Sequence, residues 1–92
     1  IIRAFIWGGI NVVLDALQMT NRDDAHIYLK EMFRFPDYYG ENLDALYDCL
    51  CGVQFLYVRI ENMTEDNLYT KRIIRVMKAA GATVDVEWKE AI

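Results

Sequence analysis

A short run rich in β-branched residues, INVVL at residues 10–14, narrows the folds that this chain can adopt. Three of its five residues are β-branched, and a run of this kind is typical of a strand that is covered on both faces within a parallel sheet. We therefore expect residues 10–14 to form a buried central strand.

Helix and strand signals alternate along the rest of the chain. Asn42 is a favourable N-cap, Pro36 closes the helical pattern before it, and Gly81 stops the last one. Thr20–Asp24 supplies capping residues for the first helix, and Gly40 is expected to supply the unusual backbone angle at the sharp entry to the second. The expected strands are 10–14, 55–60 and 83–88, and the expected helices are 25–35, 43–51 and from 64–66 to 80.

This order of elements predicts an α/β fold, a small three-stranded, largely parallel sheet with packed helices. With 92 residues, the chain is long enough for one core, so residues 1–92 are expected to form a single domain. Residues 1–9 are a possible extra N-terminal segment. The run IIRAFIW could form another strand that Gly8-Gly9 turns back onto residues 10–14.

Charge and cysteine content restrict the partners and the compartment. The 14 acidic and 10 basic residues give a net charge of −4, which disfavours nucleic acid and membrane surfaces and favours a basic partner. Cys49 and Cys51 are too close in sequence for an easy disulfide, so we expect reduced thiols and a cytoplasmic location. No apolar run is long enough to span a membrane, and residues 1–9 lack signal-peptide features.

The most unusual segment is 35–58, which contains four acidic residues and no Lys or Arg: Asp37, Glu41, Asp44 and Asp48. On a helical wheel, Leu43, Leu46 and Leu50 form one stripe, which we expect to be buried. Four residues fall on the neighbouring, solvent-facing side: Asp44, Tyr47, Asp48 and Cys51. Tyr38, Tyr39 and Tyr47 border this side and are of a residue type that anchors interfaces.

Three interpretations of the acidic side remain open. It could be no more than a solvated helix face. If the two helices are neighbours, that face could also pair with the basic residues of the third helix, namely Lys71, Arg72, Arg75 and Lys78. It could bind a basic protein. Asp44 and Asp48 could also hold a divalent metal or act as general acid and base. The enzyme interpretation has little support, because the chain has no serine and His26 lies on another helix, where we expect a surface or half-buried packing residue. We expect no enzyme activity, no metal and no cofactor.

The stretch FPDYYGENLDALYDCLCG, residues 35–52, resembles the barstar family, intracellular inhibitors of barnase-type ribonucleases. The resemblance implies that the loop and the helix after it plug the active site of a basic ribonuclease. Asp48 would take the place of an RNA phosphate, Asp44 would bind a basic residue at the cleft edge, and Tyr38 would stack on the catalytic histidine. Gly40, Asn42 and Leu43 would shape the contact loop.

The sequence departs from the family pattern at the rim of this expected interface. Tyr47 stands where the family archetype has Trp, Cys51 where it has Thr, and Val76 where its long helix offers a Glu. These differences bear on which enzyme the protein would bind more than on the way it would bind. The alternative is a barstar-like interaction module that binds a different basic toxin or a regulatory partner.

Overall fold

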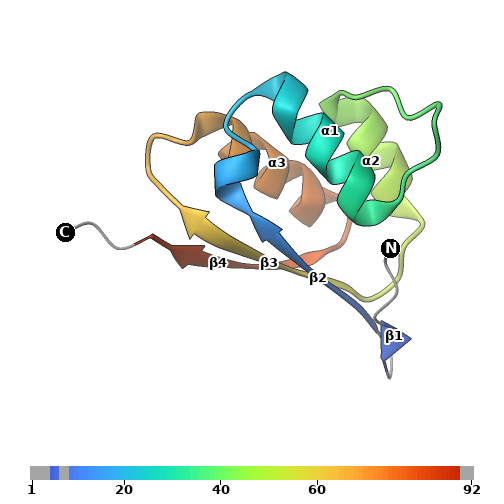
Figure 1. Ribbon diagram of the computed structural model, residues 1–92. Coiled ribbons are helices and arrows are strands. Elements are labelled where there is room, and N and C mark those ends of the chain that lie inside the picture. Colours follow the sequence, from blue (N-terminus) through green and yellow to red (C-terminus); the bar gives the residue numbers. More distant parts are fainter. Residues whose placement is uncertain (1–4, 7–8, 90–92) are drawn as a thin grey trace.

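The computed structural model describes residues 5–6 and 9–89 and shows a sheet with three helices packed on one of its faces (Figure 1). The helices are α1 (Arg22–Phe33), α2 (Leu43–Cys51) and α3 (Leu68–Ala79). The strands are β1 (Phe5–Ile6), β2 (Gly9–Asp15), β3 (Leu56–Met63) and β4 (Thr83–Trp88), and a short 3-10 helix, η1 (Ala16–Gln18), follows β2. The predicted α/β fold is confirmed.

The strands lie in the order β1-β2-β3-β4, and both β2–β3 and β3–β4 are parallel. The expected three-stranded parallel sheet is therefore present. The segment before it adds β1, which pairs antiparallel with β2 through Phe5 opposite Ile10 and Ile6 opposite Gly9. The expected strand in residues 1–9 is confirmed at Phe5–Ile6, whereas Gly8 of the expected turn lies outside the described residues.

The expectation that residues 10–14 are covered on both faces is wrong. Val12 and Leu14 are buried, but Val13 between them is 49% exposed. The strand is central in the order of the sheet, yet all three helices lie on the same face, so every second side chain points to solvent (Figure 1). β-branched residues suit both positions, and for that reason the run alone did not reveal the open face.

The core fills the space between the covered face of the sheet and the helices. It combines strand and helix residues distant in sequence, including Leu14, Val58, Ile60, Leu29, Leu46, Leu50, Ile73 and Met77, all of them 1% exposed or less. Burial of such side chains is the main favourable contribution to folding. It holds α2 firmly against the rest of the domain.

The helix starts follow a common pattern of asparagine caps. The side chains of Asn21, Asn42 and Asn67 each accept a hydrogen bond from the backbone N–H three residues later. The start of α2 is as predicted. The start of α3 is later than the predicted 64–66, because Asn67 is its cap and also donates from Nδ2 to the carbonyl of Ala16.

The helix ends are set by left-handed residues or by glycine. α1 stops at Phe33, before the predicted 35, because Arg34 adopts a left-handed conformation with φ 58° two residues ahead of Pro36. α3 ends before Gly81, whose φ of 104° favours glycine, and this agrees with the prediction.

Candidate protein-interaction site

The two sides of α2 are divided as the helical wheel predicts. Leu46 and Leu50 are buried, and Leu43 is partly buried against the core. The side chains on the other side are exposed, namely Asp44, Tyr47, Asp48 and Cys51. We call these four residues the acidic face.

The entry to α2 is held by a compact set of contacts. The Asn42 side chain accepts a hydrogen bond from the Ala45 N–H (2.8 Å) and donates one to the Gly40 carbonyl (3.2 Å). The left-handed backbone angle expected at Gly40 is found instead at Glu41, with φ 53°, so that expectation is wrong. Gly40 serves close approach, because a Cβ there would lie 3.3 Å from the Ala45 Cβ.

Most of the acidic side chains in segment 35–58 keep their charge unpaired. Asp37 lies 3.7 Å from the Lys30 ammonium group. Glu41, Asp44 and Asp48 have no Lys, Arg or His within 4.0 Å in the part of the chain that the structure describes. α2 packs beside α3, yet no ion pair joins their described residues, so the pairing considered for the basic residues of α3 does not occur.

The three tyrosines near the acidic face have different environments. Tyr38 is 87% exposed and Tyr47 is 41% exposed, so both are accessible to a partner. Tyr39 is only 5% exposed, and its ring packs against Phe35 with centroids 4.6 Å apart. The expectation that Tyr39 borders the interface is therefore wrong. Its ring fills the core beneath the contact loop, residues 35–42.

His26 is fully buried, contrary to the expectation of a surface or half-buried residue. Its Nδ1 lies 2.7 Å from the Tyr39 hydroxyl, and its Nε2 lies 2.7 Å from the Tyr69 hydroxyl. In the neutral ring one nitrogen donates and the other accepts, so one tyrosine is an acceptor and the other a donor. Burial, with a smaller contribution from the charge of Arg22, lowers the pKa of His26. This network joins the contact loop to α1 and α3.

Nothing in the sequence pattern pointed to this network. The three residues are 13 and 43 positions apart, and no periodicity relates a histidine on one helix to a tyrosine in a loop. Only the tertiary structure, in which α1, the contact loop and α3 meet, brings them together.

The two thiols are free, as expected. Burial, with a smaller effect of Asp48, raises the pKa of the partly buried Cys49. Cys51 is exposed one turn after Tyr47, and the interaction with its side chain is the main cause that raises the pKa of Tyr47. These features describe a polar rim on the acidic face rather than a nucleophilic site.

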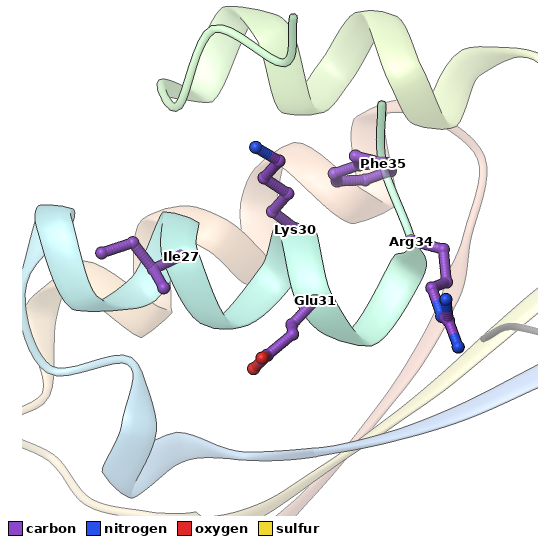
Figure 2. A pocket seen from close by; sticks show the side chains of 5 residues that line it. All are labelled: Ile27, Lys30, Glu31, Arg34 and Phe35. Carbon is purple, nitrogen blue, oxygen red and sulfur yellow. The ribbon is translucent and has the colours of Figure 1, made fainter. Parts of the chain in front are cut away.

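A broad depression on the outer side of α1 does not form a second site. It is lined by Ile27, Lys30, Glu31, Arg34 and Phe35 (Figure 2). In Figure 2 the Glu31 and Arg34 side chains point away from Lys30 and do not converge on a common point. Lys30 also interacts with Asp37. The depression therefore lacks a set of groups that could hold a ligand.

Two further properties concern residues 5–6 and 9–89. Within them, no three His, Cys, Asp or Glu side chains lie close enough together to hold a metal ion. No helix described there has the length and hydropathy to cross a membrane.

Comparison with known proteins identifies the relatives of this chain. It is 49% identical over 41 residues to a Bacillus subtilis (strain 168) protein named "Putative ribonuclease inhibitor YrdF". The aligned part covers 45% of this chain and 45% of that protein, so less than half of the relative's length is matched. The model of the family described as Barstar (barnase inhibitor) matches residues 10–83, from the second strand to the start of the last. The chain therefore belongs to the Barstar family.

Proposed function

We propose that this protein is not an enzyme but an inhibitor of a basic, barnase-type ribonuclease, and that the acidic face and the contact loop block the active site of that enzyme. Family membership supports the role of ribonuclease inhibitor. The observation that carries the proposal is the pair of exposed carboxylates, Asp44 and Asp48, without an ion-pair partner in the described part of the chain.

A ribonuclease cleft binds phosphate through positively charged groups, and a carboxylate can form charge-assisted hydrogen bonds with the same groups. The helix dipole favours negative charge only in the first turn of a helix, and Asp48 lies beyond the first turn of α2. The dipole therefore does little to stabilise the Asp48 charge in the free protein. Its charge is therefore available to the cleft of the enzyme. Asp44, one turn earlier, would bind a basic residue at the edge of the cleft.

The repulsion between Asp44 and Asp48 also favours binding. Like charges four residues apart on a helix destabilise it by a few tenths of a kcal/mol. A cationic cleft removes this repulsion, so the free protein is slightly destabilised relative to the complex. The core contacts of Leu46 and Leu50 and the Asn42 cap keep α2 rigid, which reduces the entropy lost on binding.

The remaining predicted contacts surround the two carboxylates. Tyr38 is exposed enough to stack on an aromatic side chain such as a catalytic histidine. Gly40, Asn42 and Leu43 would shape the loop that approaches the enzyme. Tyr47 and Cys51 would form the rim. The free thiols suit the reducing cytoplasm, where we place the protein.

The test is the rate of RNA cleavage by a barnase-type ribonuclease titrated with the protein. We expect stoichiometric inhibition, weakened most by Asp48→Ala, by about 2 kcal/mol or more as at interface hot spots, and next by Asp44→Ala. Asp23→Ala is the matched control, because Asp23 is exposed in the first turn of α1 as Asp44 is in that of α2. Association should also slow as salt rises.

Equal losses for the three variants would contradict the role of the acidic face. Absence of inhibition by the unmodified protein would favour the second candidate, a different basic toxin or a regulatory partner. The replacement of the family's Trp and Thr by Tyr47 and Cys51 at the rim is the observation in favour of that candidate.

A further inference from the structure

A shallow groove of about 250 Å³ lies beside the acidic face, where the beginnings of the three helices meet. The residues that line it are Arg22, Asn42, Leu43, Asp44, Tyr69 and Arg72. Arg22 is the first residue of α1, and Asn42 is the cap of α2. Tyr69 and Arg72 lie in the first two turns of α3. The groove is continuous with the acidic face through Asp44, which belongs to both.

The groove carries positive charge, unlike the face next to it. Arg22 and Arg72 are both exposed, and neither has a carboxylate within 4.0 Å among the described residues. Arg22 and Arg72 line the groove together with Tyr69. Burial raises the pKa of Tyr69, and the charges of the two arginines oppose this shift. The positive ends of the helix dipoles add to this charge.

The arrangement fits a carboxylate better than a phosphodiester. Two guanidinium groups around one groove suit a planar acidic group, which each can bind in a bidentate manner. An RNA strand would have to pass Asp44 inside the groove and Asp48 one turn away, and the chain as a whole has a net charge of −4. A single acidic side chain on a protein surface meets only Asp44 as a like charge in the groove, against the two guanidinium groups of Arg22 and Arg72.

We propose that an acidic side chain of the inhibited ribonuclease docks in this groove between Arg22 and Arg72, while the basic cleft of the enzyme binds Asp44 and Asp48. The proposal rests on the inhibitor function proposed above and adds the charge pattern of the partner. The enzyme must present a carboxylate beside its cationic cleft. A ribonuclease that is basic over this whole area is repelled by the arginines, so the groove selects among ribonucleases.

The experiment uses the barnase-type ribonuclease that the protein inhibits most strongly among a panel of them. Inhibition constants are measured for Arg22→Glu and Arg72→Glu, with Arg75→Glu as control. Arg75 is exposed on α3, lies outside the groove, and its reversal changes the net charge by the same amount. We expect each groove variant to raise the inhibition constant at least about tenfold more than the control.

A second measurement identifies the partner group. Each surface Asp and Glu of the enzyme is replaced by Lys, and one such enzyme variant should restore inhibition by Arg72→Glu while it weakens inhibition by the unmodified protein. Equal effects of Arg72→Glu and Arg75→Glu, or tighter inhibition by Arg72→Glu, overturn the proposal. A third outcome also overturns the proposal: the protein alone binds labelled single-stranded RNA, and Arg72→Glu abolishes that binding. The groove would then be a phosphate site.

The two proposals fail in different ways. If inhibition depends on Asp48 but not on Arg22 or Arg72, the inhibitor function stands and the acidic contact in the groove is wrong. If no ribonuclease of the panel is inhibited, the inhibitor function is overturned, and the docking of a ribonuclease in the groove is overturned with it.

Discussion

Replacement of the buried His26 by leucine tests whether the His26 network stabilises the domain and its contact loop. Leucine is of similar size, so His26→Leu keeps most of the packing and removes the two hydrogen bonds, each 2.7 Å long. The Tyr39 hydroxyl then remains in a site that is 5% exposed, without a partner. An unsatisfied buried hydroxyl reduces the free energy of unfolding by about 1–3 kcal/mol. The hydroxyl of the half-buried Tyr69 can bond to water instead, so the loss of its hydrogen bond reduces the free energy of unfolding by only about 1 kcal/mol. We expect a total loss of about 2–4 kcal/mol.

The assay is urea unfolding at pH 7.5 of the unmodified protein, His26→Leu, Tyr39→Phe and the double variant. Because Tyr39→Phe removes the hydroxyl that His26→Leu leaves without a partner, the double variant should be about 1 kcal/mol or more above the stability that additivity predicts. Tyr57→Phe combined with His26→Leu is the control, since the Tyr57 side chain is on the open face of the sheet and bonds to Asp85.

Additive losses in the His26 and Tyr39 double variant would refute the reasoning. They would mean that water reaches the Tyr39 hydroxyl once the imidazole is gone. A loss below about 1 kcal/mol in His26→Leu alone would show that the network contributes little to folding.

Two further predictions follow from single groups. Folding lowers the pKa of His26 from its ordinary 6.5, so below that pH the unfolded chain binds more protons than the folded protein. The free energy of unfolding therefore keeps its full value above pH 6.5. Below pH 6.5 it falls by at most about 1.4 kcal/mol per pH unit. His26 is the one histidine of the chain, so urea unfolding between pH 7.5 and 5.5 should show this slope and His26→Leu should lack it; an equal slope in that variant would contradict the assignment. Asn42→Ala and Asn21→Ala should each cost about 1 kcal/mol as lost helix caps, measured by the same unfolding. Only Asn42→Ala should also weaken ribonuclease inhibition. Equal inhibition by the two variants would show that the start of α2 does not contribute to the interface.

Much of the candidate site was predictable because α2 is a short amphipathic helix with clear signals. The cap at Asn42 and the stripe of Leu43, Leu46 and Leu50 determine which side of the helix faces the core. The exposure of Asp44 and Asp48 follows from the same periodicity. Local pattern is sufficient here, since a helix orients side chains by its own geometry.

The errors occurred where the environment of a residue depends on distant segments. The exposure of Val13 depends on which face of the sheet the helices cover. The burial of Tyr39 and the two hydrogen bonds of His26 depend on how α1, the contact loop and α3 pack together. The position of Arg22 and Arg72 beside Asp44 is of the same kind, because it requires the starts of three helices to meet.

The sequence by itself thus determined the order and type of the elements, the parallel sheet, and the acidic side of α2, since these depend on spacing and capping within short segments. The tertiary structure alone decided that one face of the sheet stays open, that His26 joins two tyrosines, and that a positively charged groove adjoins the acidic face. The physical reason is that the burial of a side chain and the distance between charged groups depend on packing between segments that are far apart in the chain. The spacing of residues within one short segment does not specify that packing.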